Sequence, residues 1–280
     1  SDTVDVAGFA EISISGNAVG TAVDTIVFGA KNLASIGKGT VISAKDVSVS
    51  ASSDEKMVNI VAGVGGSGGT ANVQGSVSTI VKNMYTAAAI GTLGENAQEA
   101  DATGVKISTD GNASVISYDN ADIVNIAGNL GLNFGNANIG AGVITMVDNS
   151  KLISNIGKGA VIDASGNGSP KQIPIGDAAI ETVVCDNGNA SINYRRAKRN
   201  NKSVTGVIVG AFGNNALNLI AISGGGSAGT AGVNAAVATL VQNNIVQSTI
   251  STNAAINANN REHRTKSSVT VAATSDTDES

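Results

Sequence analysis

The chain has 280 residues, a formal net charge of −5, and 42% hydrophobic but only 2% aromatic residues, with no tryptophan. So few large rings exclude an ordinary large globular core, while the high hydrophobic content excludes intrinsic disorder. The acidic balance argues against nucleic acid as a partner, because nucleic-acid binding requires a basic surface.

The chain contains four copies of one pattern: valine, any residue, threonine, a large apolar residue and valine. The copies span 22–37, 76–91, 142–157 and 236–251, and each has an isoleucine nine residues after its last valine. An internal repeat of this kind is typical of a stacked architecture. The positions that we predict to form the repeat core are Val23, Val27, Ile36, Val77, Val81, Ile90, Val143, Val147, Ile156, Val237, Val241 and Ile250.

Alternating apolar residues on either side of each copy, as in 47–50 and 269–271, predict β-strands. A helix competes over 76–91, because Ile80 and Met84 lie at helical spacing. We favour a strand, because β-branched residues fill the copies and suit pleated surfaces better than helices. Glycine also interrupts the first copy at Gly29.

The distance from one copy to the next is uneven, at 54, 66 and then 94 residues. A solenoid tolerates such drift, because a segment inserted at a turn leaves the stacked coils in register. With about 18 to 25 residues per coil, we expect about 11 to 13 coils. Their strands would stack about 4.8 Å apart into a rod of roughly 50 to 60 Å.

The inward face of the repeat is open to two interpretations. If the valines face inward, the large residues at Ile26, Ile80, Met146 and Leu240 face outward and form a broken apolar stripe. Such a stripe is covered by the chain itself or marks an interaction surface. In the opposite phase the large residues lie inside. In the first phase, Val81→Asp is expected to unfold the neighbouring coils, because it buries an unpaired charge.

Two segments interrupt the repeat, at about 94–111 and 163–202, while 1–280 as a whole is predicted to be a single fragment of a longer tandem array. Binding residues tend to lie on loops that a rigid scaffold holds. The candidate partner-contact residues form a basic cluster, Arg195, Arg196, Lys198, Arg199 and Lys202. Such a cluster can contact an anionic glycan, a lipid surface or nucleic acid. The common alternative is a solvated loop, or one paired with nearby acidic residues.

No catalytic, cofactor-binding or metal site is predicted. The only histidine, His263, lies in a charged turn, and Cys185 follows two valines as a small buried hydrophobe would. Acidic residues such as Glu55 and Asp119 are interpreted as dispersed at turns, which disfavours the carboxylate pair of a polysaccharide-active enzyme. The glycine run 65–69 lacks the aspartates of calcium loops and the lysine of phosphate loops.

A glycine- and alanine-rich apolar run, a V-x-T-I-V strand followed by asparagine, and the segment VISAKDVSVSASSDEK (41–56) together carry a resemblance. The chain resembles the passenger repeats of large Gram-negative surface exoproteins, namely the filamentous-haemagglutinin-like, leukotoxin-like and autotransporter adhesins. The resemblance covers nearly the whole chain and is strongest over 41–90 and 217–256. It implies export across the outer membrane and an all-β fold, a right-handed parallel β-helix (β-solenoid) with loop insertions.

The expected function is therefore structural and adhesive: a passenger segment of a bacterial adhesin, secreted or held on the external face of the outer membrane. A single cysteine is consistent with this origin, because secreted eukaryotic proteins of this size usually have several. The expected partners are a host-cell surface protein or glycan, other bacteria, and neighbouring repeats of the parent chain. We expect no cofactor and no membrane-spanning segment. A leukotoxin-like cytotoxin passenger and a polysaccharide-active β-helix enzyme are the alternatives.

Overall fold

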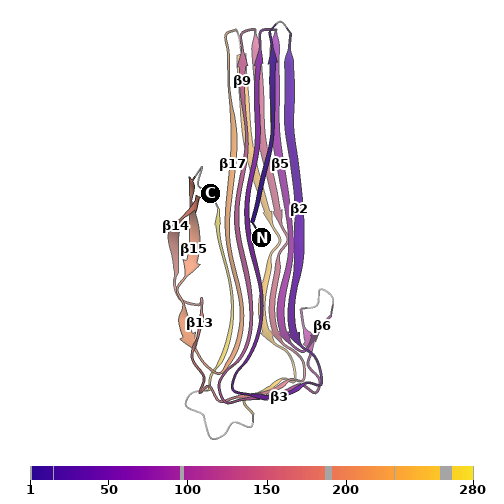
Figure 1. Ribbon diagram of the computed structural model, residues 1–280, viewed down its shortest axis with the longest axis vertical. Helices are drawn as coiled ribbons and strands as arrows, with labels where there is room; N and C mark the ends of the chain where they lie inside the picture. Colours follow the sequence, from indigo (N-terminus) through magenta and orange to yellow (C-terminus); the bar gives the residue numbers. More distant parts are fainter. Residues whose placement is uncertain are drawn as a thin grey trace.

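The protein is all-β, with 77% strand and 0% helix in the computed structural model, which describes residues 2–14, 16–94, 98–186, 191–229, 231–258 and 267–279. Its parallel strands are stacked in sheets, and two broad layers of long strands run side by side (Figure 1). Strand β5 (Ala71–Ile90) covers the segment for which a helix competed. The strand prediction is therefore confirmed there.

Three parallel sheets are built from strands that recur along the chain. Sheet A contains β1 (Asp2–Ser13), β4 (Val47–Ser67), β9 (Ala113–Asn133), β17 (Val207–Ser227) and β21 (Val269–Glu279). Sheet B contains β5 with β2 (Ala18–Ile36), β10 (Ala137–Asp148), β11 (Lys151–Ile156), β18 (Ala231–Gln242) and β19 (Ile245–Ile250). The short sheet C contains β3 (Val41–Ala44), β8 (Lys106–Thr109), β12 (Val161–Ala164) and β20 (Ala255–Ile256).

Each repeat supplies one passage through sheets A, B and C before the chain returns to sheet A one strand further along. The four copies of the pattern lie next to one another in sheet B, position for position. Their first valines pair in the order Val23, Val77, Val143, Val237. The spacing of 54 residues is thus one passage, and the expected coil of about 18 to 25 residues is wrong.

The coil length was underestimated because glycines that resemble turn residues lie inside strands. Gly63 is within β4, a strand of 21 residues, and Gly20 is within β2. The ring of Phe9 fills the space beside both. A Cβ atom on Gly20 or Gly63 would lie 2.0 or 2.1 Å from that ring. These glycines therefore make room for a neighbouring ring and do not reverse the chain.

The corner that leads into sheet C does require an unusual backbone. Gly39, Gly104 and Gly159 occupy it in three passages with φ of 75°, 78° and 80°, and Asn253 occupies it in the fourth with φ of 59°. Glycine adopts this left-handed conformation without a steric penalty, and asparagine tolerates it better than most residues. The same local geometry thus recurs wherever the chain turns from sheet B.

The phase with the large residue inside is the one that the structure adopts, so the predicted valine core is wrong. Val23 is 64% exposed and Val237 is 51% exposed, whereas Ile80 and Met146 are completely buried. Val27 and Val241 are also exposed, and Val77, Val81, Val143 and Val147 are half-buried. The larger side chains fill the gap between two sheets about 10 Å apart, while valine and threonine suit the pleated outer surface.

The four isoleucines of the pattern do face inward. Ile90 and Ile156 are fully buried, and Ile36 and Ile250 pack against the same apolar cluster from the two outer strands. This cluster lies at the end of the molecule where sheet C closes the space between sheets A and B. We call that end the base half.

The opposite half, which ends in the tight turns between sheets A and B, comprises 3–27, 57–81, 123–147 and 217–241, and we call it the tip half. Its interior is apolar near Ile80 and becomes polar toward the turns. The buried polar side chains there include Asn59, Asn72, Gln74, Ser76, Ser78, Asn125, Asn129 and Asn138. A second, smaller apolar cluster contains Val61 and Ile144, so the interior of the tip half is a mixture of apolar and polar side chains.

Both inserted segments leave the long strands in the base half, and the β14–β15 part of the longer one extends up to mid-height (Figure 1). The shorter holds β6 (Thr92–Leu93) and β7 (Ala100–Asp101), and so it begins before the predicted 94–111 and ends before sheet-C strand β8. The longer holds β13 (Lys171–Ile173), β14 (Ala178–Asp186), β15 (Ser191–Arg199) and β16 (Lys202–Val204), close to the predicted 163–202. Ile173 packs against Ile208 and Phe212, so the longer segment covers the outer face of sheet A.

The phase of the repeat can be tested with two neighbouring residues. Ile80→Asp should lower the free energy of unfolding by several kcal/mol, because it places an unpaired charge in a dry interior. Val81→Asp should change it by less than about 1 kcal/mol, because that side chain faces outward. Urea unfolding followed by circular dichroism measures both, and equal losses for the two variants would contradict the assigned phase.

Candidate functional site

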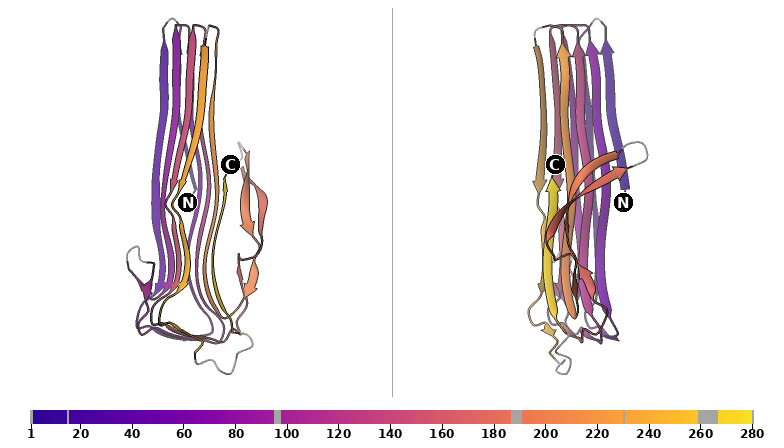
Figure 2. Two further views of the ribbon diagram at one scale, coloured as in Figure 1. Left: turned by 180° about the vertical axis from the view of Figure 1, so that it is seen from behind. Right: turned by 90° about the vertical axis from the view of Figure 1, so that its left-hand side faces the viewer.

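The predicted basic cluster lies on the longer inserted segment. Arg195, Arg196, Lys198 and Arg199 are on β15, which pairs antiparallel with β14 to form a hairpin. Lys202 is on β16, which pairs with β13 closer to the base. The hairpin crosses the outer face of sheet A (Figure 2, right). The five residues are thus divided between two small two-stranded sheets.

Ion pairs fasten this hairpin to the body of the protein. Arg196 lies 3.5 Å from Asp122 of β9, and the Nε atom of Arg199 donates hydrogen bonds of 3.0 and 2.8 Å to the two carboxylate oxygens of Asp276 in β21. The single Nε–H group is shared between the two oxygens, and a hydrogen bond between charged groups of this kind is stronger than one between neutral groups. Arg196 and Arg199 therefore hold the hairpin in place.

The other basic side chains remain toward solvent. Lys198 pairs with Glu181 across the hairpin at 3.2 Å, but both groups are well exposed. Arg195 and Lys202 are exposed as well. The structure thus separates the predicted cluster into anchoring residues and three residues that a partner could reach.

A second constellation of charges lies between the sheets, where the sequence analysis expected none. The side chain of Lys82 is completely buried, and three carboxylates surround its ammonium group. Its Nζ atom donates a hydrogen bond of 3.1 Å to Asp119 and lies 3.9 Å from Glu55 and 4.0 Å from Asp148. A buried lysine requires such partners, because an unpaired ammonium group in a dry interior is very costly.

Hydrogen bonds hold the carboxylates of this buried cluster in place. Ser53 donates to Asp119. Asp148 accepts hydrogen bonds from Ser150 at 2.5 Å and from Asn244 at 3.0 Å. The cluster therefore links strands of sheets A and B through the interior of the molecule.

The ionisation of Glu55 is strongly disturbed. The pKa of its carboxyl group is raised to about 7, chiefly by burial and also by the nearby charge of Asp119, while Lys82 opposes the rise. Close to neutral pH this carboxyl group therefore exchanges a proton. The cluster gives the interior a titratable group in a range where carboxylates are normally ionised.

The cavity beside the buried cluster is small. A cavity of about 10 Å³ lies beside Asp119 and Asn215, which is room for about one water molecule. A sugar ring does not fit there, although glycoside hydrolysis needs two carboxylates on either side of the scissile bond. The contacts of the cluster are those of an internal tie between sheets.

The sequence interpretation of the acidic residues needs a correction. Glu55 and Asp119 lie inside the long strands β4 and β9, with their side chains between the sheets, and not at turns. Register along one sheet could not reveal their proximity to Lys82, because the contact crosses from sheet A to sheet B. The available signal was the charge of Lys82 itself, which is aligned with Phe28 in β2 and Asp148 in β10.

Of the two residues considered for nucleophilic catalysis, the structure places only Cys185. Cys185 belongs to β14 and is paired with Ile192 of β15. His263 lies outside the described residues. Within the described ranges, no group of three or more histidine, cysteine, aspartate or glutamate residues is arranged to hold a metal ion. The described part of the chain also contains no helix with the length and hydropathy to cross a membrane.

Removal of the buried ammonium group should destabilise the protein. We expect Lys82→Met to lower the free energy of unfolding by about 3–5 kcal/mol near neutral pH, because it leaves the carboxylates without their counter-charge. The loss should shrink at pH 4, where carboxylates begin to take up protons. Urea unfolding at both pH values measures this, and a loss below about 1 kcal/mol at neutral pH would show that water screens the cluster.

Glu55 predicts a distinct pH dependence. The Glu55 carboxyl group binds a proton more tightly in the folded protein than in the unfolded chain. This difference stabilises the folded protein at low pH. This stabilisation is lost as the pH rises from the ordinary value of 4.5 through about 7. Glu55→Gln, which stays neutral, should lose less stability between pH 5 and pH 8 than the wild type. Glu99→Gln, at an exposed position, is the control; identical pH profiles for all three proteins would contradict the assignment.

Comparison with known proteins identifies no relative of this chain. No protein-family model, no curated protein and no solved structure matches it. The functional interpretation therefore depends on the geometry alone.

Proposed function

We propose that this chain is a structural and adhesive segment of a bacterial surface-anchored or secreted protein, built as a right-handed parallel β-solenoid. In this function the stacked sheets are the rigid body, and the inserted hairpin is displayed to a partner. The partner is a host-cell surface protein or glycan, or another bacterium. Neighbouring repeats of a parent chain would extend the same sheets.

The observation that carries this proposal is the position-for-position pairing of the four repeats. Val77 pairs with Val23 on one side and with Val143 on the other, and the same register continues over each full strand of sheet B. Passages of unequal length preserve this register, because their additional residues are inserted at the corners between strands. A body of this kind gains rigidity from continuous backbone hydrogen bonding between neighbouring repeats.

The displayed hairpin is the second support. Its base is closed by backbone hydrogen bonds of 2.8 Å from Gly176 to Asn200 and 3.0 Å from Asn200 to Asp177. Arg196 and Arg199 fix its orientation, while Arg195 and Lys198 are presented to solvent. An anchored hairpin with exposed basic side chains suits an acidic glycan or an acidic protein surface.

Excision of the hairpin tests this proposal. Residues 178–199 are replaced by a short glycine–serine link, since the flanking residues are already hydrogen-bonded to each other. We expect the circular dichroism spectrum of a β-protein to persist, and binding to an acidic glycan array and to cultured host cells to fall at least tenfold. The paired variants Arg195→Ala and Lys198→Ala should reduce binding in the same direction without an effect on folding.

The shorter inserted segment provides the matched control. Replacement of 94–99 by a two-residue turn between β6 and β7 removes a loop that lacks the basic cluster. Binding should survive this change. Unchanged binding after loss of the hairpin would exclude the hairpin as the contact, and no binding by the intact chain would remove the adhesive part of the proposal.

A further inference from the structure

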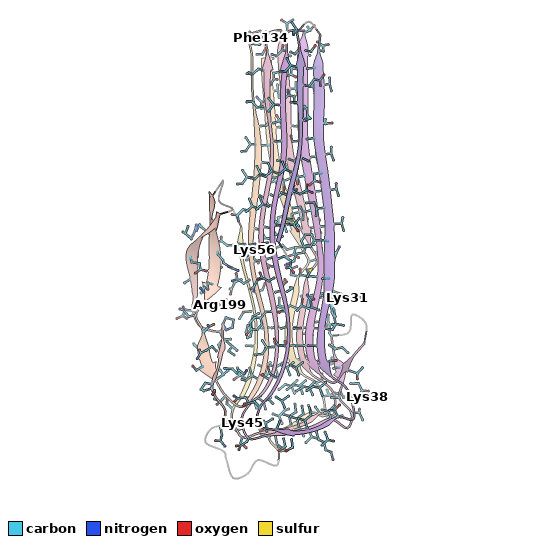
Figure 3. The ribbon with its side chains drawn as sticks, viewed as in Figure 1. Lys31, Lys38, Lys45, Lys56, Phe134 and Arg199 are labelled. Carbon is cyan, nitrogen blue, oxygen red and sulfur yellow. The ribbon has the colours of Figure 1, made fainter. Side chains whose placement is uncertain are left out.

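The tip half is almost free of charge. No aspartate, glutamate, lysine, arginine or histidine occurs in 57–81, 123–147 or 217–241. In the first repeat, Asp5, Glu11 and Asp24 have registers that place them on the interior face of their strands. Figure 3 shows the contrast, with Phe134 at the tip and the labelled lysines at mid-height or in the base half.

The outer face of sheet B in the tip half is an array of apolar residues and threonine. Five outward positions recur on four neighbouring strands. By row they are Val19, Val73, Ile139 and Val233; Thr21, Gly75, Ala141 and Ala235; Val23, Val77, Val143 and Val237; Thr25, Thr79, Thr145 and Thr239; and Val27, Val81, Val147 and Val241. Exposed apolar patches larger than a few hundred Å² mark interaction sites.

The outer face of sheet A is apolar as well. The exposed large apolar residues on sheet A in this half are Val6, Ile12, Val64, Leu130, Leu132, Ile220 and Ile222. The turns add two exposed apolar side chains, Ile14 at 90% and Phe134 at 79%, beside polar residues such as Asn17 and Thr70. Apolar surface thus covers both broad faces of the tip half.

The interior of the same half mixes apolar clusters around Ile80 and Ile144 with buried polar side chains, so polar groups lie inside while the outer faces are apolar. Asn72, Asn138 and Ser78 are buried between the sheets, where Asn72 donates a hydrogen bond of 3.0 Å to Asn138. A water-soluble β-protein normally alternates apolar residues toward the core with polar residues toward solvent. Strands with the opposite alternation are suited to an apolar surrounding medium.

The height of the uncharged region corresponds to the thickness of a lipid hydrocarbon layer. The ten residues 58–67 of β4 extend over about 33 Å at about 3.3 Å per residue, and the hydrocarbon core of a bilayer is about 30 Å thick. Charged residues resume at one level on neighbouring strands. Lys56 pairs in register with Asp122, and Lys82 with Asp148.

We propose that the tip half embeds in a phospholipid bilayer, with its outer faces among the acyl chains and the charged base half in water. Lipid accounts for the apolar character of both broad faces, whereas a second copy of the chain would cover one face. This inference does not depend on the proposed adhesive function, because it rests on the chemistry and the height of the tip half.

The open edges of sheet B set a condition on this embedding. Strands β2 and β18 each have a partner on one side only, and unpaired backbone groups are costly in hydrocarbon. The outward rows on these two strands are of the same type, for example Val23 and Val237. A neighbouring repeat or a second copy could therefore pair there, and membrane binding should increase with protein concentration.

A single tryptophan can report the contact, because the chain has none of its own. Phe134→Trp places the probe at the tip, and Val41→Trp places it at an exposed position of sheet C in the base half. The protein is mixed with phosphatidylcholine vesicles that carry bromine on their acyl chains. We expect a blue-shifted, strongly quenched emission from Phe134→Trp and an unchanged emission from Val41→Trp.

Two pairs of exposed apolar residues provide matched variants. Val23→Lys with Val237→Lys charges the tip half, and Leu33→Lys with Val41→Lys charges exposed positions of the base half. Because all four residues are exposed, the fold should survive each change, which circular dichroism checks. The first pair should lower vesicle affinity by on the order of tenfold or more, and the second pair should leave it unchanged.

Three results would overturn the inference: no quenching of Phe134→Trp, equal quenching of both probes, or equal effects of the two lysine pairs on vesicle affinity. Light scattering in the absence of vesicles distinguishes a further case. Suppose that the unmodified chain forms dimers, that only the variant with Val23→Lys and Val237→Lys is monomeric, and that neither of these two proteins binds vesicles. The apolar faces then contact a second copy. Glycan and cell binding through the hairpin would be unaffected by any of these outcomes.

Discussion

Register between neighbouring parallel strands is the constraint on which the rest of this structure depends. Each side chain in sheet B lies about 4.8 Å from the equivalent side chain of the next repeat, so each position favours residues that pack or pair with their neighbours in the row. Isoleucine does so at Ile36, Ile90, Ile156 and Ile250. Asparagine does so by hydrogen bonding, as in the bonds of 3.0 Å from Asn149 to Asn83 and 2.9 Å from Asn243 to Asn149.

The same constraint explains where charges occur. Like charges directly opposite each other in neighbouring strands are destabilising, so a charged position cannot simply recur from repeat to repeat. The buried row that contains Lys82 places a negative group beside a positive one, because Asp148 is the register partner in β10. Carboxylates from sheet A complete the cluster, and they tie the two layers together where the apolar interior of the base half gives way to the polar interior of the tip half.

The two halves share one backbone plan but have opposite chemistry. The base half has an apolar interior, a short third sheet and inserted segments that cover part of its surface. In the tip half the same strands have amides and hydroxyls among the apolar residues inside, and valine, isoleucine, leucine and threonine outside. Average hydropathy does not reveal this difference, because alternating residues cancel within any window along a strand, whereas a helix with the same surface would contain a continuous apolar run.

The sequence by itself determined that the chain is β-rich, that it contains four equivalent segments, and approximately where those segments are interrupted. These properties follow from local composition and spacing, which are visible without contacts.

The sequence could not determine the phase of the pattern, because alternation is the same whether Val81 or Ile80 faces inward. The volume available between the two sheets decided the phase. The sequence also could not determine the coil length, because Gly63 has the same letter whether it turns the chain or makes room for Phe9. The buried cluster around Lys82 and the division of the basic residues into anchors and exposed groups arise from contacts between sheets and with the inserted hairpin. Only the tertiary structure decided these features, because residues far apart in the chain meet across a sheet interface that no local pattern encodes.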